Sequence, residues 1–266
     1  MRAASPYWAV LRARFSALLQ YRAAALAGLA TQVFWGLMRI MVLEAFFSSS
    51  TKAHPMTHDE MVGYVWLGQA TLGVLPWNND KDVQTQVRTG SVAYELTRPV
   101  DLYALWYARH VAMRTAPTLL RAIPMFVIAM LWFGMRPPVG VAAGLAWFVA
   151  TGGAILLSAA ISNLTAIAQF WTVSGRGLQY LMSSLVWMFS GLAVPLPLFP
   201  EILQPLLHAL PFRGIMDSPF RLWLGHLPAT ALPAVLFQQL VWTAIFVAIG
   251  RALAAAGQRR LVVQGG

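Results

Sequence analysis

The organisation of the chain turns on one stretch, Asn79-Asp80-Lys81-Asp82-Val83-Gln84-Thr85-Gln86-Val87-Arg88-Thr89-Gly90-Ser91-Val92-Ala93-Tyr94-Glu95-Leu96-Thr97-Arg98-Pro99-Val100-Asp101. It is a polar, charged interruption between two apolar runs, and it concentrates four of the nine acidic residues of the chain. Asn79 or Asp80 can cap a short helix that has Arg88 in its last turn, and Gly90 can end that helix. We expect this segment, 79–101, to lie outside the membrane, where another molecule contacts it.

The composition indicates a membrane protein. Of the 266 residues, 58% are hydrophobic and only 11% are charged, and the mean hydropathy is +0.61. One soluble core cannot hide so much apolar surface behind so few charges. The net charge of +10 does not indicate nucleic-acid binding, because the basic residues alternate with apolar runs and form no continuous stripe. The absence of cysteine excludes disulfides, thiolate metal sites and a cysteine nucleophile.

The hydropathy pattern predicts an all-α polytopic membrane protein, with six transmembrane helices in a single domain that covers residues 1–266. A helix needs about 20 residues to cross a bilayer. The expected spans are 23–47, 61–77, a third that ends at 135 after a cytoplasmic extension from 102, then 141–168, 179–198 and 231–254. No cleavable targeting peptide is expected before the first span.

Two further segments are expected to lie at the membrane without crossing it. Residues 5–22 place apolar side chains at helical spacing and predict a basic amphipathic helix on the membrane surface, the alternative being the first turns of an over-long transmembrane helix. Residues 195–233 hold eight of the sixteen prolines and two apolar pieces of about ten residues, too short to cross. We expect re-entrant half-helices within 199–230, on the outer side.

The distribution of basic residues gives the orientation. With six spans, 14 of the 19 lysines and arginines fall on one side: Arg2, Arg12, Arg14, Arg22, Lys81, Arg88, Arg98, Arg109, Arg114, Arg121, Arg176, Arg251, Arg259 and Arg260. Four fall on the other side, Lys52, Arg136, Arg213 and Arg221. Because basic loops remain in the cytoplasm, both termini and segment 79–101 are predicted to be cytoplasmic. The membrane is expected to be the inner membrane of a bacterium.

The chain shows no nucleotide-binding or catalytic motif. It contains no G-x-x-x-x-G-K-[ST] loop, and its lysines are Lys52 and Lys81 alone, so any ATP, as Mg-ATP, would be bound by another polypeptide. No serine, histidine and carboxylate set points to nucleophilic catalysis. His54 and His58 have a spacing that could suit a metal, but Pro55 follows the first and no other ligand joins them, which favours a solvated loop. We therefore predict no catalytic, cofactor or metal site.

Ionisable and amide side chains inside the spans are the candidates for lining a transport pathway. Arg39 and Glu44 lie within the first span, five residues apart, and either pair with a neighbouring helix or line a path. The amides either form interhelical hydrogen bonds or contribute to the lining; they are Gln32, Gln69, Asn163, Gln169, Gln238 and Gln239. We select Arg39, Glu44, Gln69, Asn163 and Gln169 as lining candidates.

Residues 89–101 closely resemble the pattern tG-x-[IV]-x-x-x-L-x-[RK]-P-[VI]-[DN] of ABC-2-type transporter permeases, in the branch of small six-span subunits. The layout of the whole chain is also similar to that family. The resemblance implies an ABC exporter in which two permease subunits, identical or homologous, are driven by two separately encoded ATPase subunits. Such a permease is not itself an enzyme. In the family, the cytoplasmic segment after the second span contacts the ATPase, together with the N-terminal interfacial helix.

By this resemblance, segment 79–101 is the coupling segment. The residues that it assigns to coupling are Asp80, Asp82, Arg88, Gly90, Glu95, Arg98, Pro99 and Asp101. Gly90 and Pro99 would set the path of the backbone. For Arg98 and Asp101 there is an alternative to direct contact with the ATPase: they pair with each other and fix the turn into the third helix, with Asp101 as its cap.

The expected function is therefore ATP-driven export by a permease subunit surrounded by membrane lipid. The aromatic and methionine content of the first, second and fifth spans favours a lipophilic or amphiphilic cargo. Two functions from other classes are weaker: a membrane enzyme for lipid-linked substrates requires a carboxylate or histidine constellation, and an ion-driven carrier requires intramembrane acids and two repeated halves. The sequence shows neither set of features.

Overall fold

The computed structural model describes residues 5–20, 22–49, 55–172 and 176–258, and all regular structure in them is helical. The α-helices are α1 (Pro6–Leu19), α2 (Arg22–Ser49), α3 (His58–Ala70), α4 (Lys81–Thr89), α5 (Val92–Leu96), α6 (Leu102–Trp132), α7 (Val141–Ile167), α8 (Arg176–Phe189), α9 (Gln204–Ala209), α10 (Asp217–Leu224) and α11 (Leu232–Gln258). Short 3₁₀ helices are η1 (Leu72–Val74), η2 (Ala168–Phe170), η3 (Leu196–Leu198), η4 (Glu201–Leu203), η5 (Phe212–Gly214) and η6 (Ala229–Ala231). The expected all-α class is confirmed.

Four helical segments in the described residues are long and apolar enough to cross a membrane: Gly28–Ser49, Leu102–Trp132, Val141–Phe170 and Ala229–Gly257. They correspond to the first, third, fourth and sixth expected spans. In the second and fifth expected spans, α3 has 13 residues and α8 has 14, or about 20 Å of helix each. The reason is local: α3 gives way to the turn at η1, and α8 ends shortly before Gly191, whose φ is +95°.

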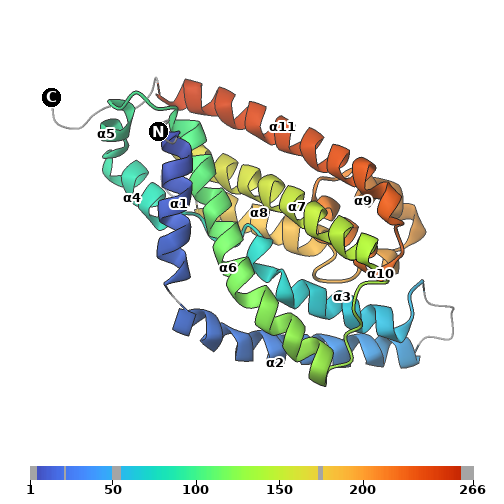
Figure 1. Cartoon of the computed structure of the whole chain (residues 1–266). Coiled ribbons are helices and arrows are strands. Elements are labelled where there is room, and N and C mark those ends of the chain that lie inside the picture. Colours follow the sequence, from blue (N-terminus) through green and yellow to red (C-terminus); the bar gives the residue numbers. More distant parts are fainter. Residues whose placement is uncertain (1–4, 21, 50–54, 173–175, 259–266) are drawn as a thin grey trace.

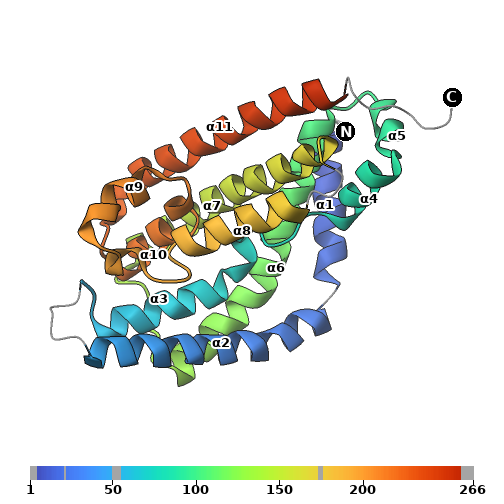
Figure 2. The ribbon, with the colours of Figure 1, turned by 180° about the vertical axis from the view of Figure 1, so that it is seen from behind.

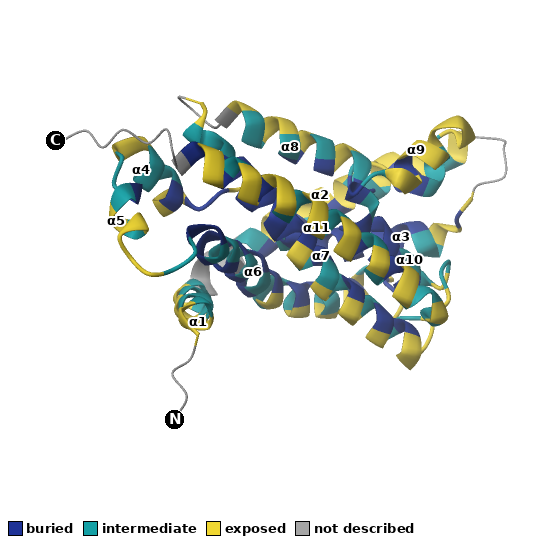
Figure 3. Ribbon diagram, turned by 90° about the horizontal axis from the view of Figure 1, so that it is seen from above, coloured by how far each residue is buried: buried dark blue, intermediate teal, exposed yellow. Residues whose placement is uncertain are grey.

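The long helices form a bundle with α3 at its centre. α7 packs along both α6 and α11, and α2 packs along α3 (Figures 1 and 2). Every residue of α3 from Met61 to Ala70 is buried, including Trp66. Burial is concentrated where α3, α7 and α10 meet, and the outer faces of the long helices remain exposed (Figure 3). An exposed apolar exterior of this kind is what lipid contact requires.

The N-terminal helix α1 is separate from α2. It runs across the direction of α2 and packs along α6 (Figure 1). The alternative of one over-long helix is therefore wrong, while a separate helix at the edge of the bundle agrees with the expected segment 5–22. Several residues used above for orientation or as a metal alternative lie outside the described residues: Arg2, Lys52, His54, Arg259 and Arg260.

The two ends of the bundle differ. The short helices α4 and α5 lie at one end, beside α1 and the end of α11, and α9 and α10 lie at the opposite end (Figure 1). The expected re-entrant segment 199–230 consists of α9, α10 and short 3₁₀ helices. α6 continues as one helix through Pro117 and Pro124, so it reaches from the α5 end deep into the bundle.

Candidate functional site

Segment 79–101 forms α4, α5 and the turns around them, and local chemistry sets these limits. The Oδ1 atom of Asp80 accepts a hydrogen bond from the backbone N–H of Asp82 at 3.0 Å and caps α4. Gly90 ends α4 with φ +74°, a left-handed conformation that favours glycine. Asp101 caps α6 by accepting from the N–H groups of Tyr103 and Ala104. The caps and the glycine stop expected from the sequence are confirmed.

Two carboxylates and two arginines join three helices at the start of α4. Arg14 of α1 places Nη2 2.8 Å from Asp80 Oδ1 and 2.8 Å from Asp82 Oδ2. Arg109 of α6 places Nε 2.7 Å from Asp80 Oδ2 and Nη2 3.0 Å from Asp82 Oδ2. The Asp80 side chain is fully buried, whereas that of Asp82 is 58% exposed. We call these four residues the Asp–Arg cluster.

The cluster keeps Asp80 ionised. Burial alone would raise the pKa of Asp80, because it removes water from the carboxylate. The hydrogen bond and charge of Arg109, the charge of Arg14 and the bond from the Asp82 N–H outweigh burial and hold the pKa of Asp80 below its ordinary value. Asp80 therefore acts as a permanent negative junction between α1, α4 and α6.

Other contacts anchor the segment to the remaining long helices. Thr165 Oγ1 of α7 donates a hydrogen bond to Asn79 Oδ1 at 3.1 Å. Gln84 Nε2 donates to Gln179 Oε1 of α8, also at 3.1 Å. Asp101 Oδ2 forms an ion pair of 3.0 Å with Arg251 Nη2 of α11. Val83 and Val92 are buried beside Trp106 of α6. The segment is thus a packed part of the fold, in contact with α1, α6, α7, α8 and α11.

The segment also leaves a set of residues open to solvent. Tyr94 is 76% exposed and the Arg98 side chain is 66% exposed. Arg88, Leu96 and Pro99 are exposed as well. An exposed aromatic residue next to arginines is typical of a protein-binding surface. We call these five residues the docking face.

The structure separates the roles of Glu95, Arg98 and Asp101. Arg98 Nη1 lies 3.2 Å from Glu95 Oε2. The other oxygen of Glu95, Oε1, accepts a hydrogen bond from Gln86 Nε2 at 3.5 Å. Asp101 pairs with Arg251 instead. The expected alternative in which Arg98 pairs with Asp101 is therefore wrong, since each has its own partner. Glu95 and Asp101 hold turns, while most of Arg98 faces solvent.

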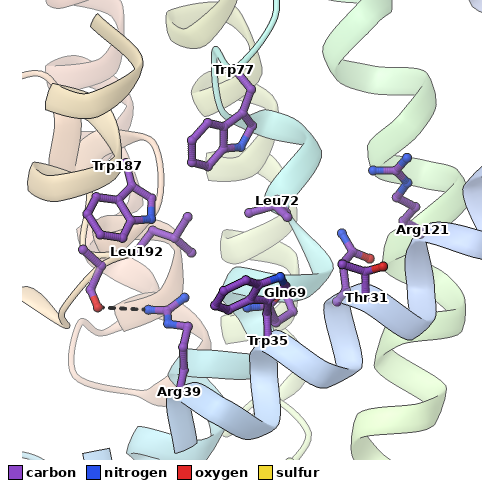
Figure 4. Close-up of a pocket in the computed structure, with 12 residues that line it drawn as sticks. Thr31, Trp35, Arg39, Gln69, Leu72, Trp77, Arg121, Trp187 and Leu192 are labelled. Atoms are coloured by element: carbon purple, nitrogen blue, oxygen red, sulfur yellow. Dashed lines mark hydrogen bonds between the residues drawn. The ribbon is translucent and has the colours of Figure 1, made fainter. Parts of the chain in front are cut away.

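A pocket of about 630 Å³ lies between α2, α3, α6 and α8, with the turns that follow α3 and α8 (Figure 4). Its lining residues are Gly28, Thr31, Gln32, Trp35, Arg39, Gln69, Leu72, Trp77, Arg121, Trp187, Leu192 and Ala193. Arg39 Nη2 donates to the backbone oxygen of Ala193 at 3.3 Å. The walls are predominantly aromatic and aliphatic, with the polar groups at separate points.

Two of the five lining candidates, Arg39 and Gln69, line this pocket. The other three do not. Glu44 Oε1 lies 2.9 Å from His58 Nε2 near the far end of α2. Asn163 is buried in α7 and donates to the backbone oxygen of Tyr103 at 3.2 Å, and Gln169 lies in η2.

Sequence reasoning missed the functional positions of three arginines. Arg14 and Arg109 entered only the count of basic residues, and no local pattern places them against residue 80. Arg121 entered only the count of basic residues on the cytoplasmic side, and in the structure it lies eleven residues, about 16 Å, before the C-terminal end of α6 at Trp132. A charge at that depth in an apolar run was the available signal.

A family model described as ABC-2 family transporter protein matches residues 33–265. The chain belongs to this ABC-2 family. The resemblance seen in residues 89–101 is thereby confirmed, and the protein is the membrane component of an ABC-2 transporter. Membership generally implies an ATPase partner and a transport subunit that is not the catalytic one. Comparisons with curated proteins and with solved structures found no match.

Proposed function

We propose that this ABC-2 family protein is the permease subunit of an ATP-driven exporter, and that segment 79–101 receives the motion of separate ATPase subunits. One observation carries the proposal: the segment exposes the docking face and is anchored to the bundle by the Asp–Arg cluster, in which the Asp80 side chain is fully buried. Mg-ATP is bound and hydrolysed by the partner. A second permease subunit, a copy of this chain or a homologue, completes the transporter.

The Asp–Arg cluster is the proposed route of transmission. A force on α4 acts on Asp80, which is held through both oxygens by arginines of α1 and α6. Charge-assisted hydrogen bonds to a buried group resist stretching more than exposed ion pairs do. Movement of α4 is therefore passed to α6, which carries Arg121 at the pocket.

The proposed topology has six crossings, with segment 79–101 and both termini in the cytoplasm of a bacterial cell. The second crossing would be completed by η1 and the residues that follow α3, and the fifth by the residues that follow α8. Irregular backbone is tolerated at membrane depth when protein covers it. Leu75 and Leu192 in these extensions are buried, which supports the proposal. Residues 199–230 would then face the outside.

The proposed cargo is lipophilic or amphiphilic and passes along the face that carries the pocket. Trp35, Trp77 and Trp187 supply apolar, aromatic walls to it. The pocket lies between helices of the first, second and fifth expected spans, where a relative movement of helices changes its shape.

Co-purification with a candidate ABC ATPase tests the proposal. Tyr94→Glu combined with Arg98→Glu alters the docking face without touching the core. We expect it to weaken retention of the ATPase by about tenfold or more, because aromatic and arginine residues dominate binding energy at interfaces. Permease yield and elution volume should remain those of the wild type.

Ile202→Glu is the matched control. Ile202 is 87% exposed at the opposite end of the bundle, so its variant should retain the ATPase fully. The coupling assignment is wrong if the docking-face variant holds the ATPase as well as the wild type does. It is also wrong if removal of residues 80–88 leaves complex formation and ATPase activity unchanged.

A further inference from the structure

Two polar side chains in the pocket have buried atoms without partners. Gln32 of α2 is 4% exposed, and neither its Oε1 nor its Nε2 has a hydrogen-bond partner among the described residues. The Nε atom of Arg121 on α6 is likewise buried and unpartnered. Both residues line the same pocket. Buried polar groups in proteins are nearly always hydrogen-bonded, so this pair calls for an occupant with polar atoms.

Arg121 packs against the helix that carries Gln32. A Cβ atom placed on Gly28 would lie 3.5 Å from Arg121 Cζ, so the guanidinium lies directly over the bare backbone of α2. Gln32 follows Gly28 by one helical turn and therefore lies on the same face of α2. Arg121 and Gln32 form one polar end of the pocket.

The charge of that end is not neutralised by the protein. The pocket is lined by two arginines and by no carboxylate, and no ion pair joins Arg39 or Arg121 to an acid within the described part of the chain. Arg39 has a partner in the Ala193 carbonyl, whereas Arg121 Nε has none. Arg39 lies eleven residues from Gly28, about 16 Å along α2, so the two arginines occupy opposite ends (Figure 4).

Between the arginines, the pocket offers an apolar environment. Trp35 and Leu72 lie between them in Figure 4, with Gln69 as the one amide in that region, and Trp77, Trp187 and Leu192 complete the walls. Guanidinium groups bind carboxylates and phosphates through several parallel hydrogen bonds, and aromatic walls bind hydrocarbon. A volume of about 630 Å³ is within the range of sites for small molecules.

We propose that the pocket binds an anionic amphiphile, with its acidic group on Arg121 and Gln32 and its apolar body along the tryptophans. Arg121 donates to the acid, and Gln32 donates through Nε2. That this molecule is the exported cargo rests on the function proposed above. Binding itself does not rest on it, since it needs only the permease.

The test uses the full chain in nanodiscs of phosphatidylcholine, with 11-(dansylamino)undecanoic acid as the anionic probe and its carboxamide as the neutral one. Dansyl fluorescence reports binding of each. We expect the wild type to bind the acid more tightly than the amide. Arg121→Gln should lower the affinity for the acid by about tenfold or more, as expected for loss of a charge-assisted hydrogen bond. The affinity for the amide should not change.

Two further variants keep the result interpretable. Arg121→Lys retains the charge and should recover part of the affinity for the acid. Arg12→Gln removes an exposed arginine of α1 outside the pocket and should change neither probe. Because amide binding reports a folded pocket, a variant that fails to fold is recognised by loss of binding of both probes. If Arg121→Gln fails to fold, the affinity of Arg121→Lys for the acid tests the proposal instead. Equal affinities of the wild type for acid and amide would overturn the proposal, as would Arg121→Gln binding the acid like the wild type.

A second arm of the experiment distinguishes a site for cargo from a site for a lipid of the surrounding bilayer. Nanodiscs that contain phosphatidylglycerol at a third of the lipid should still bind the acid, because a cargo site must not be filled by the surrounding bilayer. Full displacement of the probe by phosphatidylglycerol would show a lipid site and overturn the assignment to cargo. Failure of ATPase binding with intact, Arg121-dependent probe binding would count against the proposed coupling alone.

Discussion

Asp80 combines complete burial with a full negative charge. Each of its oxygens is held by an arginine from another helix, at 2.8 Å from Arg14 and 2.7 Å from Arg109. A buried carboxylate in this setting is a structural junction, since removing its charge leaves Arg14 and Arg109 with only the half-exposed Asp82 as a shared counter-ion.

Asp80→Asn therefore should destabilise the protein more than Asp82→Asn. Both arginines keep some exposure, so we expect a loss of about 2 kcal/mol for Asp80→Asn, less than for a fully buried pair. Asp82 is 58% exposed, and its variant should cost less than about 1 kcal/mol. Unfolding of the detergent-solubilised protein measures both, and equal losses would contradict the assigned roles.

Lowering the pH should remove the contribution of the Asp80 carboxylate to the stability of the fold. The pKa of Asp80 in the folded protein lies below its ordinary value of about 3.9, so the carboxylate stabilises the fold above that pH and loses this effect as the pH falls through the folded-state pKa. The stability difference between wild type and Asp80→Asn should be constant from about pH 7 to pH 5 and shrink below about pH 4. A stability difference that grows on acidification would contradict a lowered pKa of Asp80 in the folded protein.

At this scale, the sequence predicts what is local. The caps at Asp80 and Asp101 and the stop at Gly90 follow from neighbouring residues alone, and all are present. The partners of Asp80 are 66 and 29 residues away, and the pairing with them depends on how α1 and α6 pack. No periodicity or motif encodes that packing.

Among the elements, the joint between α4 and α5 is the sharpest local constraint. Gly90 has φ +74°, and a side chain there would meet nothing within 4 Å, so its replacement acts through the backbone only. Gly90→Ala should cost about 1 kcal/mol. Gly177 in α8 also has open space but no left-handed φ, and Gly177→Ala should be neutral or stabilising. Thermal unfolding of the two variants checks this contrast. Equal melting temperatures of Gly90→Ala and Gly177→Ala would contradict the role assigned to Gly90.

Helix lengths show where hydropathy is insufficient. The first span could be predicted because α2 is apolar and uninterrupted, and α6 and α7 behave in the same way. α3 and α8 are shorter than the apolar runs that contain them, because apolar residues also occupy the buried turns that follow, such as Leu75 and Leu192. Hydropathy reports burial or lipid contact, and it does not distinguish a helix from a covered turn.

On the scale of the whole molecule, α6 connects segment 79–101, the proposed coupling segment, with the pocket. Arg109 of α6 contacts segment 79–101, and Arg121 of the same helix lines the pocket twelve residues further on. The sequence identified the segment by its motif and charge, and it selected Arg39 and Gln69 as lining candidates, while Gln32 was left open between an interhelical hydrogen bond and a lining. It could not unite them with Arg121, because the pocket exists only where four separate elements meet.

Amide hydrogen exchange in the complex with the ATPase tests the central claim, that segment 79–101 carries motion from the ATPase to the pocket. On addition of a non-hydrolysable ATP analogue, we predict that exchange changes in the ATPase, in α4 and in α2 and α3 beside the pocket. In the Asp80→Asn complex the change in the ATPase should remain, and the change in α2 and α3 should be lost. Asp82→Asn, as the control, should respond like the wild type. An Asp80→Asn complex whose α2 and α3 respond as strongly as those of the wild type would contradict the account.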